Sequence, residues 1–197
     1  MFEITNLMIG DVIRECFRVR IGKEDIKYYS EKGNNYSIWE KEKSDYRDAT
    51  PNALPVGILG ELAFAKVFNM PMDTDYKRGG DRCDFIINKN IKVDVKTSMT
   101  WKKYKSPKCF VRVGEKGKEY PIDKDIYVTN ILEEFGDDKC IISLVGYITG
   151  KRVNDLSNVE SKKYENVINK EIPILETEPI SKMYNYIKNK IGLYYGN

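Results

Sequence analysis

Three charged residues between positions 84 and 96 have the types and the spacing that metal-assisted chemistry requires. Asp94 and Lys96 stand in the run IKVDVKTS, and Asp84 stands upstream in the run CDFII. Side chains alternate along a strand, so Asp94 and Lys96 project from the same face. Mg²⁺ prefers carboxylate oxygens, and an ammonium beside the metal can hold a water or offset charge on a phosphate. The pattern therefore predicts phosphodiester hydrolysis.

The segment around these residues has the signature of a β-hairpin. Two short apolar runs flank the turn Asn-Lys-Asn at 88–90. If this turn is a three-residue loop, Ile87 pairs with Ile91, and stepping outward sets Asp84 opposite Asp94. Like charges directly across a hairpin weaken a sheet, whereas a divalent cation between them turns the cost into a binding site. We therefore expect both carboxylates to bind Mg²⁺, with Mn²⁺ as a substitute.

A third carboxylate stands in the segment just before the hairpin. Residues 51–71 predict a helix, because Pro55 suits a first turn, the interior is rich in Leu and Ala, and Pro71 ends it. Its apolar residues run almost all the way round, which predicts burial on most sides. Glu61 in its middle costs several kcal/mol unless it is paired, protonated or bound to a cation. We expect Glu61 to complete the metal site, directly or through water.

The rest of the chain supplies further elements. Strand-like runs lie at 109–113, 125–130 and 140–149, and a terminal helix follows Pro179 with apolar residues at helical spacing: Ile180, Met183, Ile187 and Ile191. Residues 1–22 predict another helix, from the spacing of Ile9, Val12, Ile13, Cys16 and Phe17. Residues 23–49 fit an irregular helix or a flap, and 154–179 an irregular tail. This order predicts a mixed α/β (α+β) fold with helices packed on a sheet.

Length and composition narrow the alternatives. A chain of 197 residues without a Pro/Gly/Ser-rich linker is expected to form a single domain. We divide it into a helical or irregular addition at 1–50, a catalytic core at 51–150 and a C-terminal extension at 151–197. Histidine is absent, which excludes every mechanism that needs an imidazole.

The remaining composition points to an intracellular protein. The four cysteines are scattered singly, without metal-binding pairs or the density of a disulfide scaffold. No apolar window is long enough for a membrane span, and the N-terminus lacks the basic region of a signal peptide. We therefore expect a cytoplasmic protein with reduced thiols and no membrane partner.

A basic segment follows the hairpin. It contains Trp101 and Tyr104 among Lys102, Lys103, Lys105, Lys108 and Arg112. Such a run could track a phosphate backbone while the aromatic residues stack on bases, and it predicts a nucleic-acid contact. A solvated lysine loop fits the same residues equally well. The net charge of +3 does not by itself indicate a nucleic-acid partner.

The motifs GELAFAKVF, GGDRCDFII and IKVDVKTS resemble the PD-(D/E)XK nuclease superfamily, phage or bacterial members in particular. The resemblance spans 54–149 and implies a restriction-endonuclease-like αβββαβ core, with a central mixed sheet flanked by helices. Carried over by position, Glu61 matches the acidic residue of the first core helix and Asp84 the motif aspartate. Asp94 and Lys96 match the second acidic position and the motif lysine. The resemblance implies metal-dependent cleavage of DNA, less often RNA, in the cytoplasm of a bacterium or of a phage host.

The sequence departs from the family pattern in two places. No proline precedes Asp84, and the Q-x-x-x-Y element of the exonuclease-like branch is absent, so an endonuclease is favoured. Asp81 is a rival to Asp84, although it falls on the opposite strand face or in the preceding loop. The sequence allows a homodimer, because one such site cuts one strand.

Two other readings of the same residues stay open. One is a catalytically inactive nucleic-acid-binding or interaction module built on the same fold. The other is a structural domain whose hairpin charges lie on a solvated face, with Lys92 and Lys96 as their partners.

Overall fold

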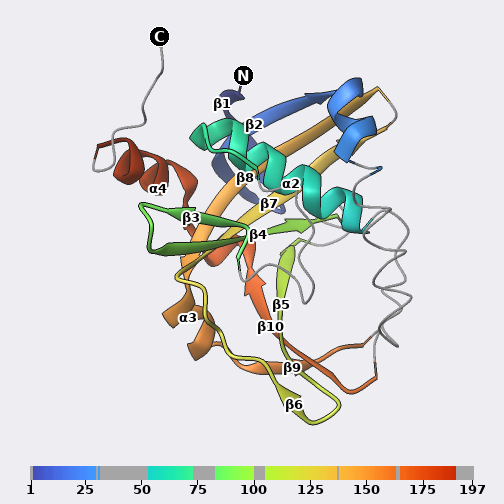
Figure 1. The fold of residues 1–197 in the computed structure, drawn as a ribbon, viewed down its shortest axis with the longest axis vertical. Helices are drawn as coiled ribbons and strands as arrows, with labels where there is room; N and C mark the ends of the chain where they lie inside the picture. Colours follow the sequence, from blue (N-terminus) through green and yellow to red (C-terminus); the bar gives the residue numbers. More distant parts are fainter. Residues whose placement is uncertain are drawn as a thin grey trace.

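A mixed central sheet forms the middle layer of the molecule (Figure 1). The computed structural model describes residues 2–29, 31, 53–72, 83–99, 105–136, 138–162 and 165–189. Two helices pack on one face of this sheet and a smaller second sheet packs on the other. The expected mixed α/β class is confirmed. No helix among the described residues is long and apolar enough to cross a membrane.

The central sheet holds seven strands, six of them in one continuous order. That order is β1 (Phe2–Ile9), β2 (Val12–Gly22), β8 (Lys139–Thr149), β7 (Ile126–Phe135), β4 (Ile91–Ser98) and β3 (Phe85–Ile87). The two-residue strand β11 (Glu178–Pro179) also pairs with β8. Neighbours in the sheet run antiparallel except β4 and β7, which are parallel. The strands expected at 125–130 and 140–149 are confirmed as parts of β7 and β8.

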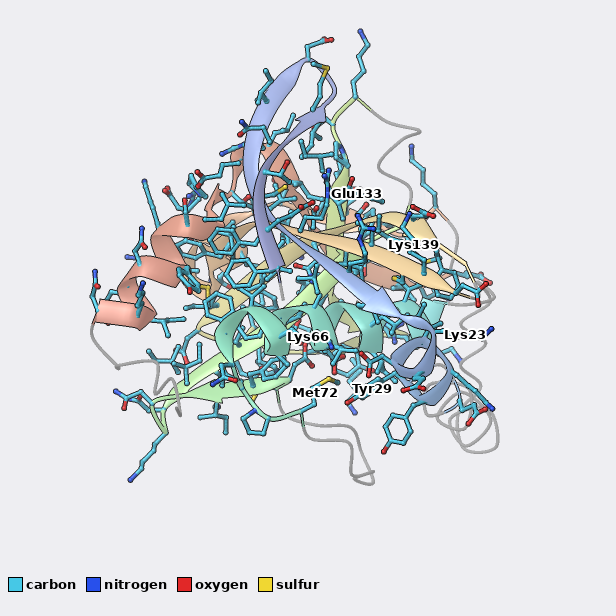
Figure 2. All side chains as sticks on the ribbon, turned by 90° about the horizontal axis from the view of Figure 1, so that it is seen from above. Lys23, Tyr29, Lys66, Met72, Glu133 and Lys139 are labelled. Atoms are coloured by element: carbon cyan, nitrogen blue, oxygen red, sulfur yellow. The ribbon has the colours of Figure 1, made fainter. Side chains whose placement is uncertain are left out.

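Residues 1–22 do not form the helix that their apolar spacing predicts. They form the β1–β2 hairpin, which pairs without a register shift from Phe2–Val19 to Ile9–Val12. Gly10 opens the two-residue turn with a φ of 59°, as a type II′ turn requires of its first position. The β-branched residues of both strands suit this pairing. The hairpin stands out from the body of the molecule (Figure 2).

The helical layer consists of α2 (Ala53–Phe68) and α4 (Ile180–Ile187). The helix predicted at 51–71 is confirmed: α2 ends before Asn69, whose φ of 49° is that of a left-handed helix cap. Leu59, Ala63, Phe64 and Phe68 pack it on the sheet. The predicted terminal helix is confirmed in α4, which buries Ile180, Met183 and Ile187; Ile191 lies outside the described residues. Residues 23–29 are helical, and 32–49 lie outside the described residues.

The second sheet holds four strands in the order β6 (Lys118–Glu119), β5 (Lys108–Glu115), β10 (Val167–Pro173) and β9 (Asn158–Glu160). The expectation of an irregular tail at 154–179 is therefore wrong, because 158–160 and 167–173 are strands. Two short helices, α3 (Gly150–Asp155) and η2 (Ile174–Glu176), flank β9 and β10 in the chain. A second buried cluster joins the two sheets, with members such as Cys109, Tyr127, Ile131 and Ile172.

Candidate active site

The hairpin that carries the predicted site has the expected register. Ile87 pairs with Ile91 and Phe85 with Val93, so residues 88–90 are the three-residue loop. Asn88 and Lys89 take φ values of 50° and 67°, which close the turn. Strand β3 begins only at Phe85, the partner of Val93, so from Asp94 onward the outer edge of β4 has no strand beside it among the described residues.

Asp84 lies against this open edge. Its backbone N–H donates to the Val93 carbonyl at 3.0 Å, and its carboxylate Oδ2 accepts from the backbone N–H of Val95 at 2.6 Å. The carboxylate thus satisfies an edge donor that a longer β3 would have satisfied with a carbonyl. This bond fixes the Asp84 side chain beside the segment that carries Asp94 and Lys96.

Asp94 and Lys96 form an ion pair on one face of β4. The Lys96 Nζ lies 2.7 Å from the Asp94 Oδ2, and the two side chains are 34% and 13% exposed. Alternation along the strand predicts that they share a face, and the contact confirms it. Val93 and Val95 fill the opposite face within the core beneath α2. The lysine is thus held beside a buried carboxylate while part of it reaches the surface.

The electrostatics of the cluster follow from burial and from its like charges. Burial, followed by the charge of Asp94, raises the pKa of Asp84 to about 7. Burial alone would lower the pKa of Lys96. The negative charges of Asp94, Asp84 and Glu61 outweigh burial, and the net effect is a raised pKa. Lys96 is therefore an ammonium at neutral pH, whereas Asp84 is close to the midpoint of its titration.

A close helix-to-sheet contact places Glu61 within electrostatic reach of Lys96. Its neighbour Gly60 lies so near β4 that a Cβ there would come within 2.0 Å of the Thr97 Oγ1. The fully buried Asn130 of β7 donates from its Nδ2 to the Gly60 carbonyl at 3.1 Å. Glu61 is half-buried, and its charge contributes to the raised pKa of Lys96.

The arrangement fits a magnesium ion held by two carboxylates better than one held by three. Within the described ranges, no group of three or more Asp, Glu, Cys or His side chains is close enough to hold a metal ion. The charge of Asp94 does contribute to the raised pKa of Asp84, so these two carboxylates lie within electrostatic reach of each other. A cation between them would remove that repulsion, and Mg²⁺ needs only one or two carboxylates besides water and phosphate oxygens.

Two residues join the site that the sequence analysis did not single out. Lys124, on the loop before β7, lowers the pKa of Asp84 by its charge, and its own side chain is only 17% exposed and paired with Asp123. Tyr127 is the register partner of Asp94 in the parallel strand, and burial followed by the Asp94 charge raises its pKa. A lysine directly before the strand-like run predicted at 125–130 was the available signal for Lys124.

The loop that carries Lys124 is held from two sides. The Asp125 carboxylate accepts from the Lys92 backbone N–H at 2.8 Å, and its carbonyl accepts from the Gly150 N–H at 2.8 Å. A Cβ on Gly150 would approach the Lys124 carbonyl to 1.9 Å. Lys124 therefore belongs to a loop that hydrogen bonds to β4 and to α3 hold in place.

The predicted nucleic-acid-binding residues do not gather at the carboxylates. Lys102 and Lys103 lie outside the described residues. Lys105 is highly exposed, and its Nζ lies 3.8 Å from the Oδ2 of Asp11 in the turn of the β1–β2 hairpin. Lys108 pairs with Glu171, and Arg112 with Glu115 at 3.6 Å. Alternation along β5 puts Lys108 and Arg112 on the outer face, opposite Cys109, whose thiol contacts the Lys96 carbonyl at 3.5 Å.

No family model, no curated protein and no solved structure matches the chain. The resemblance to nucleases therefore stays an expectation from the motif residues alone.

Proposed function

We propose that this protein is a metal-dependent nuclease that hydrolyses phosphodiester bonds, with DNA as its polymer and endonucleolytic cleavage as its mode. One observation carries the proposal: two electrostatically coupled carboxylates, Asp84 and Asp94, lie with the paired Lys96 at the open edge of β4. This arrangement is unfavourable for stability, because like charges are buried together. Ionisable groups whose pKa values are shifted by burial and by neighbouring charges are candidates for a catalytic or binding role.

The two aspartates have the role of metal ligands in this proposal. Bound Mg²⁺ or Mn²⁺ would supply a Lewis acid for the phosphate and an activated water. The bond from the Val95 N–H holds Asp84 in place, and this carboxylate would be one of the two that hold the ion. Asp94, whose Oδ2 lies 2.7 Å from the Lys96 Nζ, would be the second carboxylate to hold the ion.

Lys96 has the role of the catalytic cation. Its ammonium can orient the attacking water or offset the negative charge that develops on the phosphate in the transition state. The carboxylates around it keep it protonated, which suits charge stabilisation rather than general-base catalysis. Glu61 acts on this ammonium from α2 through its charge, so its proposed role is to help keep Lys96 protonated.

Lys96 and Asp94 give the direct test. The panel is supercoiled plasmid, linear duplex, single-stranded DNA, branched DNA and RNA, each with Mg²⁺, Mn²⁺ or EDTA. We expect metal-dependent cutting, lowered about 10²- to 10³-fold by Lys96→Met or Asp94→Asn. Lys92→Met is the matched control, because Lys92 lies on the same face of the same strand. Equal cutting by the wild type and all variants would remove the proposal.

A catalytically inactive nucleic-acid-binding module is the second candidate. It is favoured by the lack of a three-ligand cluster in the part of the chain that the structure describes. The same panel separates the two functions, because the module would bind nucleic acid in a salt-dependent way without turnover in either metal.

A further inference from the structure

Strand β1 has an open edge on the outside of the central sheet. It pairs with β2 along its whole length, and no described strand pairs with its other side. Natural edge strands are usually protected by proline, lysine or a β-bulge. The eight residues of β1 contain no proline and no lysine, and their pairing has no register shift. The outer N–H and C=O groups of β1 therefore form a template for another strand.

An exposed apolar band lies beside this edge. Ile4 and Met8 project from one face of β1 and are 65% and 63% exposed, with Asn6 between them. Ile13, the cross-strand partner of Met8, is 64% exposed and widens the band onto β2. The opposite face of the hairpin is buried through Leu7 and Ile9, so the band is not part of the core.

The edge is complementary to itself. In an antiparallel pair centred on Asn6, Ile4 of each copy lies opposite Met8 of the other. A shift by one residue would bring the exposed face of one strand against the buried face of its partner, and a shift by two would separate Ile4 from Met8. The only charge on β1, Glu3, then faces Ile9 of the second copy, so no like charges oppose each other. A two-fold contact of this kind closes on itself as a dimer.

We propose that β1 is the interface of a homodimer, in which the β1 strands of two copies pair antiparallel about a two-fold axis at Asn6. The two central sheets become one continuous sheet, and the outer backbone groups of both β1 strands gain partners. The inference does not depend on the proposed nuclease activity. It does supply two sites in fixed relation, which cutting both strands of a duplex would require.

Cysteine cross-linking tests the register. In a Cys83→Ser background the remaining native cysteines are buried. Asn6→Cys places two thiols on directly paired residues, with Cα atoms about 4.5–5.5 Å apart, within the span that a disulfide bridges. Ile4→Cys is the matched control: the two copies of residue 4 are separated by roughly 13 Å along the paired strands. We expect a covalent dimer for Asn6→Cys, none for Ile4→Cys alone, and one when Ile4→Cys is mixed with Met8→Cys. Equal cross-linking at all positions, or none at Asn6, overturns the proposal.

Sedimentation of the intact chain gives an independent readout. We expect a dimer for the wild type and a monomer for Ile4→Glu combined with Met8→Glu. Phe110→Glu is the control, because Phe110 is also exposed, at 53%, but lies on the second sheet. A wild type that is monomeric at tens of micromolar, or a double variant that remains a dimer, contradicts the interface. Neither experiment needs catalysis, so a failure here is distinct from a failure to cut DNA.

Discussion

The Asp84 carboxylate accepts a hydrogen bond from the backbone N–H of Val95 at 2.6 Å, in a position where a longer strand β3 would have offered a carbonyl. A side chain thus completes the edge of the sheet and, by doing so, comes to lie beside Asp94. The same bond that satisfies the backbone brings two carboxylates together in a partly buried site. Asp84 therefore stabilises the backbone at this edge, while its buried charge beside Asp94 costs stability.

Replacing Asp84 should stabilise the fold at alkaline pH. Burial, then the charge of Asp94, raises its pKa to about 7, against about 3.9 in an unfolded chain. The folded state therefore holds this proton to higher pH, so stability falls as pH rises from about 4 to 7. Asp84→Asn removes the titration and keeps an acceptor for Val95. We expect it to exceed the wild type at pH 8 by about 4 kcal/mol at most, with the difference vanishing near pH 4.

Urea unfolding in EDTA at pH 4, 6 and 8 measures this difference. Asp138→Asn is the control, because Asp138 is exposed and pairs only at the surface with Lys23; its effect should stay within about 0.5 kcal/mol at each pH. An Asp84→Asn protein that is no more stable than the wild type at pH 8 would show that burial and the Asp94 charge do not raise the pKa of Asp84 in the folded state.

Gly60 should not tolerate a side chain, although it lies inside a helix. A Cβ there would meet the Thr97 Oγ1 at 2.0 Å, whereas a Cβ on Gly57 of the same helix meets nothing within 4 Å. We expect Gly60→Ala to destabilise the protein by about 1–3 kcal/mol. Gly57→Ala should stabilise it by roughly 0.5–1 kcal/mol through helix propensity. Chemical denaturation of both variants checks the contrast.

A double variant tests the cause of the Gly60 effect. Thr97→Ala removes the Oγ1 and leaves the Thr97 Cβ at 3.3 Å from the new methyl group. The pair Gly60→Ala and Thr97→Ala should therefore recover part of the stability that Gly60→Ala loses. If the two losses simply add, the contact between α2 and β4 is not what requires glycine at this position.

The parts of the fold that follow from short-range rules could be predicted from the sequence. The loop length at 88–90 sets the pairing of Ile87 with Ile91, and that pairing sets the face of every residue in β4. Residues 1–22 could not be assigned in this way, because their apolar positions fit a helical period as well as a strand. The deciding feature was the two-residue turn at Gly10, whose φ is 59°.

The site was predictable only where its residues are close in the chain. Asp84, Asp94 and Lys96 belong to one hairpin, so alternation and register were enough to place them. Lys124 reaches the same site through the parallel pairing of β4 with β7, which no local pattern specifies. The strands at 158–160 and 167–173 were missed for a related reason: they are short, partly polar and stabilised by pairing within the second sheet.

Lys124 should tune the pH at which the proposed nuclease becomes active. Its charge lowers the pKa of Asp84, so Lys124→Gln should raise that pKa further. If metal binding requires the ionised carboxylate, the acidic limb of kcat/KM against pH lies near 7 in the wild type and moves to higher pH in the variant. Lys66→Gln is the control, because Lys66 pairs with Asp25 on the outer side of α2. If Lys124→Gln leaves the acidic limb of the pH profile unchanged, Lys124 does not affect the ionisation on which activity depends.

Metal binding can be measured without any substrate. A ligand that binds only the folded state at 100 times its dissociation constant adds about 2.7 kcal/mol of stability. For a chain of this length that corresponds to a rise in Tm of roughly 5–10 °C. We expect Mn²⁺ to produce such a rise at pH 8 and a smaller one at pH 5.5, because Asp84 must lose its proton before it binds the ion.

Variants of the two aspartates connect this rise to the site. Asp94→Asn and Asp84→Asn should each abolish most of the Mn²⁺ effect, although Asp84→Asn begins from a higher Tm at pH 8. Asp138→Asn, which removes an exposed carboxylate, should respond to Mn²⁺ as the wild type does. Equal shifts in all four proteins would mean that the ion binds elsewhere. The hairpin carboxylates would then be a cost to the fold that no metal ion offsets, and the Val95 N–H, Lys96 and Lys124 would be left to stabilise them.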